Sequence, residues 1–186
     1  MKIIKWILIV LAVLIVLGTA YLGYLGMFST LPVTEKEMGP YTMVYEHFTG
    51  PYQDTGKIFY KVNQALIADG ITPTRGIGIY YDDPKVTAPA SLRSDCGSIV
   101  EEKDLPKLVK LKKYTVRIIS RQYSIVAEFP AKSALSYMIG PMKGYPALMK
   151  YASEKKTRWS KGSMPMELYD MPAKKIYYIM GIEKGK

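Results

Sequence analysis

The stretch Tyr80–Pro84 reads YYDDP, and Leu168–Pro172, which begins 88 residues later, reads LYDMP. A second echo precedes each copy, because Tyr41–Glu46 (YTMVYE) resembles Tyr123–Glu128 (YSIVAE) at an offset of 82 residues. Two echoes in the same order predict that one supersecondary unit is used twice. A duplicated α+β unit usually forms its ligand site along the seam between its halves, so the pattern favours a binding module over an enzyme.

The segments around these echoes predict the same order of elements in each half. In the first half, strands are expected over 41–48, 75–81 and 92–100, with a helix from Ile58 that stops at Gly70. In the second half, strands are expected over 123–129, 164–170 and 175–182, after an additional strand over 116–120. A short helix over 133–139 should break at Gly140-Pro141, and a second should start at Pro146. Two strand-helix-strand-strand units predict an α+β domain with an antiparallel sheet.

Composition limits the chemistry of the chain. Its 186 residues, 48% hydrophobic and 23% charged, suit one globular domain with an appendage. Cys96 is the only cysteine and His47 the only histidine, so an intramolecular disulfide and a cysteine-based zinc site are excluded. No nucleophile motif accompanies His47. We therefore expect no metal and no cofactor.

The N-terminus predicts a membrane anchor over residues 1–28. From Trp6 to Phe28 there is no charged residue, and a helix of this length spans about 35 Å, enough for a hydrocarbon core of about 30 Å. The alternative is a cleaved signal peptide, with Gly18-Thr19-Ala20 as its small-residue cleavage site. Residues 29–39 are then expected to form a linker, and residues 40–183 the folded domain.

The charges predict an orientation and a class of partner. Lys2 and Lys5 precede the apolar span whereas Lys36 follows it, which favours an extracytoplasmic domain. Without Lys2 and Lys5, 24 basic residues remain against 16 acidic ones, and this excess favours attraction to anionic lipid headgroups. No DNA-reading helix or RNA-binding signature accompanies the charge, so no nucleic acid is expected as partner. The lysine-rich stretch 101–113 predicts a solvated connector between the halves.

The two halves resemble the GyrI-like small-molecule-binding domain family, also found as the effector-binding domain of multidrug-responsive transcription activators. The resemblance covers about Pro40–Ile182 and is carried by 79–84 (IYYDDP), 96–100 (CGSIV), 127–130 (AEFP), 145–148 (YPAL) and 166–169 (MELY). These pieces are most similar to a membrane-anchored branch, whose eukaryotic members are receptors for selective autophagy of the endoplasmic reticulum. The present sequence lacks the long acidic tail of those receptors after its last expected strand. We therefore expect the fold and its groove to transfer, but not the receptor role.

The resemblance implies that Glu167 lies in the ligand groove, where it faces lipophilic cations or acts in hydrolysis. Tyr169 shares its face of the strand, because side chains alternate along a strand. Tyr81, the counterpart of Tyr169 in the echo, and Trp159 are expected as wall residues. The structural alternative is a solvent-exposed glutamate paired with a lysine. Asp82 and Asp170 are interpreted as turn formers.

Three functions follow from these expectations. The leading hypothesis is a membrane-tethered domain that binds lipophilic or cationic small molecules in a groove between its two repeats. The second is a hydrolase of strained-ring or epoxide compounds in which Glu167 activates water. The third is a non-enzymatic adaptor that holds a protein partner through the groove or the lysine-rich connector.

Overall fold

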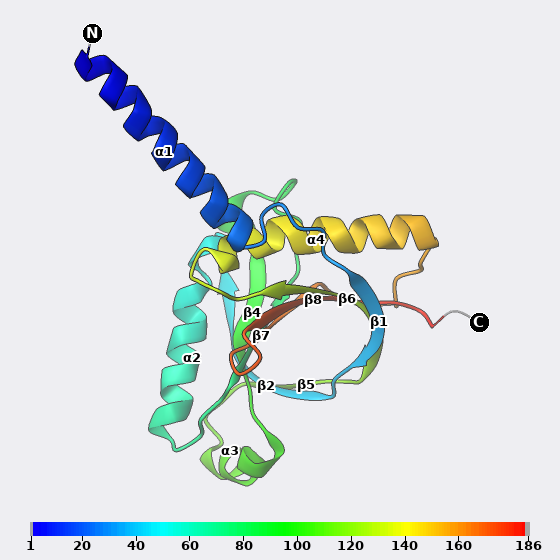
Figure 1. The fold of residues 1–186 in the computed structure, drawn as a ribbon. Coiled ribbons are helices and arrows are strands. Elements are labelled where there is room, and N and C mark those ends of the chain that lie inside the picture. The colour runs from blue at the N-terminus through cyan, green and yellow to red at the C-terminus, as the bar shows by residue number, and fades with distance from the viewer. Residues whose placement is uncertain (1, 185–186) are drawn as a thin grey trace.

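Two strand-helix-strand-strand units lie side by side in one curled sheet (Figure 1). The computed structural model describes residues 2–184. Within this range the helices are α1 (Lys2–Tyr24), α2 (Gly56–Ala68), α3 (Leu105–Leu111) and α4 (Ser136–Lys155). The strands are β1 (Val33–Met38), β2 (Tyr41–Thr49), β3 (Arg75–Tyr80), β4 (Arg93–Ile99), β5 (Val116–Ile119), β6 (Gln122–Pro130), β7 (Met166–Asp170) and β8 (Lys175–Gly181).

The order of strands across the sheet reflects the duplication. It is β1-β6-β8-β7-β3-β4-β2-β5, and every pairing between neighbours is antiparallel. The boundary between the two repeats runs between β7 and β3. On one side of it lie β3, β4 and β2, and on the other lie their counterparts β7, β8 and β6. Helix α2 packs on β2 and β4, and α4 packs on β6 and β8. The predicted duplicated α+β fold is therefore confirmed.

The two halves exchange their edge strands. Strand β1 precedes β2 in the chain but pairs with β6, and β5 precedes β6 but pairs with β2. The two connecting turns meet, because a Cβ on Gly39 would lie 3.2 Å from the carbonyl oxygen of Ser120. Gly39 has φ +87°, which favours glycine. Residues 29–39, expected as a linker, thus contain an edge strand of the sheet.

The repeat is real, but its register differs by one residue from that of the sequence echoes. Val44 packs under α2 and Ile125 packs under α4, whereas Val126, the match to Val44 in the echo, lies in the core inside the curl. Likewise, Tyr81 packs inside the curl whereas Tyr169 packs against the α4 core. Because side chains alternate, a slip of one residue changes the face of the sheet. Tyr80, rather than Tyr81, is the structural counterpart of Tyr169.

Helix α4 is a single helix, although Pro141 and Pro146 lie inside it and a break was predicted at Gly140-Pro141. A proline removes one backbone donor, but the rest of the helix is held by packing on the sheet. Gly140 and Gly144 face Tyr178 so closely that a Cβ on Gly144 would lie 2.2 Å from its ring. The lysine-rich connector also contains a helix, α3, whose Leu108 is buried in the core under α2.

Helix α1 is long and apolar enough to cross a membrane, by length and composition, and a signal sequence would have the same properties. It projects away from the domain (Figure 1), and none of its residues is buried. The residues that follow it are held firmly, since Leu25 is fully buried in the core under α4. Lys132 caps the end of the helix: its Nζ donates to the Tyr24 carbonyl at 2.6 Å and lies 4.1 Å from the centre of the Tyr24 ring.

Candidate functional site

A buried carboxylate lies at the seam between the two repeats. Glu167, on the central strand β7, is only 5% exposed. Tyr145 Oη donates to its Oε1 at 2.8 Å, and Tyr169 Oη donates to its Oε2 at 2.5 Å. Strand alternation places Glu167 and Tyr169 on the face that α4 covers, and α4 supplies Tyr145. The solvent-exposed, lysine-paired glutamate considered above is therefore not what the structure contains.

Aromatic rings from both repeats surround this carboxylate. Tyr80, on β3, lies with its Oη 3.1 Å from that of Tyr169. Phe59, on α2, packs edge-on against Tyr169 at 5.2 Å between ring centres, and Tyr137, on α4, lies 5.7 Å from it. We call Glu167 with Tyr80, Tyr145 and Tyr169 the tyrosine cluster. Its members come from two central strands and one helix, so it exists only where the halves meet.

Glycine on β3 lets these rings approach the sheet. Gly78 pairs with Glu167 across the central strands. A Cβ at this position would lie 3.1 Å from both the Phe59 ring and Tyr80 Oη. The space above Gly78 is therefore filled by aromatic side chains.

Burial raises the pKa of Glu167, and the hydrogen bonds from Tyr169 and Tyr145 offset this effect only in part. Burial, and then the charge of Glu167, raise the pKa of Tyr145 and Tyr169 well above its ordinary value, so both hydroxyls stay protonated donors. Among residues 2–184, the hydrogen-bonding partners of the carboxylate are these two neutral tyrosines, and no lysine or arginine pairs with it. A buried carboxylate without a cationic partner is stabilised when it takes up a proton or when a cation binds beside it.

The structure brings together two of the four side chains expected at the groove, Glu167 and Tyr169. Tyr81 lies on the opposite face of the sheet, inside the curl. Trp159, which is 39% exposed, pairs with Ile182 beyond β8 and contributes to no part of the tyrosine cluster. Both remain predictions as ligand-contacting residues.

Two members of the tyrosine cluster were not expected. Tyr80 stands in the repeated stretch itself, but the register of the echo pointed to its neighbour. Tyr145 lies in the YPAL piece of the family resemblance, where a break between two helices was expected. Strand alternation along β3 would have indicated Tyr80, because it places Gly76, Gly78 and Tyr80 on one face of the sheet. Gly76 and Gly78 pair with Tyr169 and Glu167 across the seam, so that face is the one that carries the carboxylate.

A second polar cluster lies inside the curl. Asp95, 2% exposed, contacts His47 Nδ1 at 2.8 Å, Arg117 Nη1 at 2.8 Å and Tyr81 Oη at 2.5 Å. A small cavity of about 180 Å³ adjoins it, lined by Tyr81, by residues of β3, β5, β6 and β7, and by the loop before β7. Here a buried carboxylate has its own arginine, so its charge is compensated within the fold, in contrast to that of Glu167.

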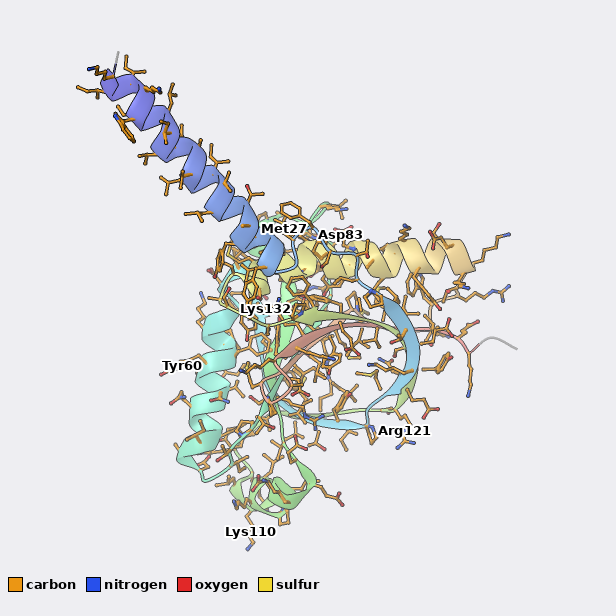
Figure 2. The ribbon with its side chains drawn as sticks, in the orientation of Figure 1. Met27, Tyr60, Asp83, Lys110, Arg121 and Lys132 are labelled. Atoms are coloured by element: carbon orange, nitrogen blue, oxygen red, sulfur yellow. The ribbon has the colours of Figure 1, made fainter. Side chains whose placement is uncertain are left out.

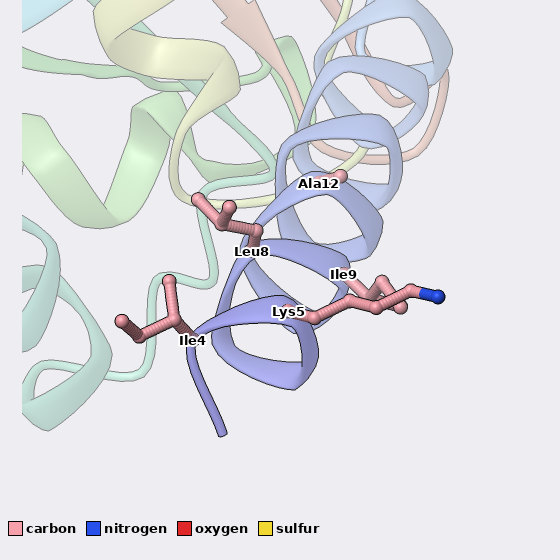
Figure 3. A pocket seen from close by; sticks show the side chains of 5 residues that line it. All are labelled: Ile4, Lys5, Leu8, Ile9 and Ala12. Carbon is pink, nitrogen blue, oxygen red and sulfur yellow. The ribbon is translucent and has the colours of Figure 1, made fainter. Parts of the chain in front are cut away.

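The remaining features give no separate chemistry. The hollow in Figure 3 runs along the exposed surface of α1 and is lined only by residues of that helix: Ile4, Lys5, Leu8, Ile9 and Ala12. It has no residue in common with the surroundings of Glu167, which lies on β7. Burial raises the pKa of the Cys96 thiol to about 12, so it is protonated at neutral pH. Across residues 2–184 there is no group of three or more His, Cys, Asp or Glu side chains that could hold a metal ion.

The fold defines a class of protein: duplicated α+β domains whose helices cover the outer face of a curled antiparallel sheet. The model of the GyrI-like small molecule binding domain matches residues 31–176, which is most of the chain. The chain therefore belongs to the GyrI-like family, as the resemblance implied.

Two curated relatives and two solved structures illustrate the likeness. Testis-expressed protein 264 of Homo sapiens and its homolog in Mus musculus are each 30% identical over 147 residues, covering 74% of this chain. The chain spans less than half of their length, 45% and 46% respectively. The crystal structure of the EcmrR C-terminal domain has a TM-score of 0.58 at 12% identity, covering 83% of this chain and 99% of that one. SAV2435 bound to tetraphenylphosphonium has a TM-score of 0.52 at 11% identity, covering 82% and 94%. At these identities the two structures establish the fold alone.

Proposed function

We propose that this protein is a membrane-tethered domain that binds lipophilic, cationic small molecules at Glu167. The observation that carries the proposal is a carboxylate that is 5% exposed and has tyrosine hydroxyls, rather than a lysine or arginine, as partners. A solved relative in fold, SAV2435, holds tetraphenylphosphonium, which is a lipophilic cation. The apolar helix α1 supports the tether.

The energetics favour a cation over a neutral ligand. An ionised carboxylate held away from water costs several kcal/mol, and an opposite charge in the same site removes much of that cost. Aromatic faces add about 2 kcal/mol or more per desolvated cation contact. Entry of the ligand requires that rings around Glu167 move, and Tyr137, which is 40% exposed, is the most exposed of these rings.

The test is binding of tetraphenylphosphonium to the full chain in detergent micelles, measured by equilibrium dialysis. We expect Glu167→Gln to weaken binding about tenfold or more, which corresponds to about 1.4 kcal/mol. Glu46→Gln is the matched control, because Glu46 is a surface glutamate paired with Lys61 at 2.8 Å. Binding should also weaken as the pH falls through the raised pKa of Glu167, since protonation removes the charge. Equal affinity of wild type and Glu167→Gln at pH 8 would refute the proposal.

Hydrolysis of strained rings or epoxides is the second candidate, because a carboxyl group with a raised pKa beside two tyrosine donors has the properties of a general base. It is separated from simple binding by turnover. An epoxide consumed by the wild type and not by Glu167→Gln would replace the binding proposal with an enzymatic one.

A further inference from the structure

The surface of α4 that faces away from the sheet is apolar. Leu135 at the start of the helix and Met138, Met142 and Met149 within it are between 41% and 67% exposed. Their spacings of three, four and seven residues place them on one side of the helix. The opposite side, with Gly140, Gly144 and Leu148, is buried against the sheet. We call the exposed set the outer face of α4.

Basic residues outnumber acidic ones along α4 and at its two ends. Between Lys132 and Arg158 the chain has six basic residues and one acidic residue: Lys132, Lys143, Lys150, Lys155, Lys156 and Arg158 against Glu154. Lys150 and Lys155 are exposed, and Lys150 lies only 3.9 Å from Glu154, the one acidic group available to it on this helix. An apolar stripe with a cationic border is the pattern of helices that lie in the interface of an anionic membrane.

Helix α4 is fixed relative to α1. The Lys132 contacts with Tyr24, and the burial of Leu25 in the α4 core, join the end of α1 to the start of α4. In Figure 1, α1 leaves the domain on the side of α4 that is opposite to the sheet, and α4 begins beside the base of α1 and runs away from it. Met27 and Lys132 lie at this junction in Figure 2. The start of α4 therefore lies where α1 leaves the domain, on the side from which a bilayer crossed by α1 would approach.

We infer that the outer face of α4 docks on the surface of the same bilayer that α1 crosses, with anionic phospholipids as its partner. This inference rests on the membrane tether in the proposed function. The tyrosine cluster lies directly behind this surface, since Tyr137, the neighbour of Met138, contacts Tyr169. Lipophilic cations, which concentrate at anionic membrane surfaces, then reach the seam from the lipid side.

The test uses the full chain reconstituted into vesicles of phosphatidylcholine and phosphatidylserine. An environment-sensitive fluorophore is attached to Met142→Cys on α4, or to Lys110→Cys as the matched control. Lys110 is exposed on α3, at the end of the domain far from α1 (Figure 2). Cys96 is buried with a protonated thiol and stays unlabelled. Lipids with a nitroxide on the headgroup then report proximity to the bilayer surface.

We expect quenching at position 142 to exceed that at position 110 roughly threefold or more, because an interfacial helix lies within about 10 Å of the headgroup boundary. In a second variant, Met138→Asp with Met142→Asp should abolish quenching of a label at Met149→Cys while the chain still floats with the vesicles. Equal quenching at positions 142 and 110 in a chain that floats would overturn the docking of α4 and leave the tether intact. A chain that does not float would overturn both.

Discussion

Glu167→Gln should stabilise the ligand-free protein at pH 8 and have little effect at pH 4. The carboxylate is 5% exposed and accepts two hydrogen bonds, from Tyr145 and Tyr169. Each charge-assisted bond contributes about 1.5–3 kcal/mol, while burial of the charge costs several kcal/mol. The raised pKa of Glu167 means that the cost of burial exceeds the gain from the two bonds.

The magnitude follows from proton linkage. Because the pKa is higher in the folded state, wild-type stability is full below the unfolded pKa of about 4.3 and declines as the pH rises through the folded pKa. Each unit of elevation lowers the free energy of unfolding at high pH by about 1.4 kcal/mol, or about 3–6 °C in Tm for a domain of this size. Glutamine avoids this loss. Its amide N–H can donate to Tyr169 Oη, since that hydroxyl can donate instead to Tyr80 Oη at 3.1 Å.

The assay is thermal unfolding of the full chain in micelles, followed by near-ultraviolet circular dichroism from pH 4 to pH 8. The quantity of interest is the Tm of Glu167→Gln minus that of wild type, which cancels the titration of other groups. We expect this difference to rise with pH and then level off, whereas Glu46→Gln should give a small, pH-independent difference. A Glu167→Gln variant that loses more stability at pH 8 than at pH 4 would show that the tyrosine bonds outweigh the cost of burial.

Two further substitutions test the packing and the second polar cluster. A Cβ on Gly97 would lie 1.9 Å from a backbone carbonyl oxygen of β2. Gly97→Ala should therefore lower the free energy of unfolding, measured in urea, by about 3 kcal/mol or more. Gly56→Ala is the control: there is open space around a Cβ at that position, so the change should be less than about 1 kcal/mol. Similar unfolding midpoints for the two variants would contradict the close approach of β2 and β4. Arg117→Ala leaves Asp95 buried without its arginine and should lower the free energy of unfolding by about 3 kcal/mol. Arg121→Ala removes only the exposed ion pair with Glu37, at 3.7 Å, and should lower it by less than about 1 kcal/mol. Comparable losses in the two arginine variants would mean that His47 and Tyr81 alone satisfy Asp95.

Local patterns in the sequence determined the elements and the presence of a repeat. Alternation predicted the strands, and helical spacing predicted α2, because both signals depend only on neighbours within a few residues. The apolar stretch Trp6–Phe28 predicted a helix long enough to span a membrane, which α1 is. The choice of Glu167 and Tyr169 came from the family resemblance together with strand alternation.

Tertiary structure alone decided the register, the continuity of α4 and the make-up of the tyrosine cluster. A one-residue offset between repeats costs little in sequence similarity but moves a side chain to the other face of the sheet, which is why Tyr80 replaces Tyr81. Packing against Tyr178 carries α4 through two prolines that local propensity would treat as breaks. The exchange of β1 and β5 between the halves, and the meeting of Tyr145 with Glu167, depend on contacts between residues far apart in the chain. Such contacts arise only when the whole sheet curls and buries its faces, and no local pattern encodes them.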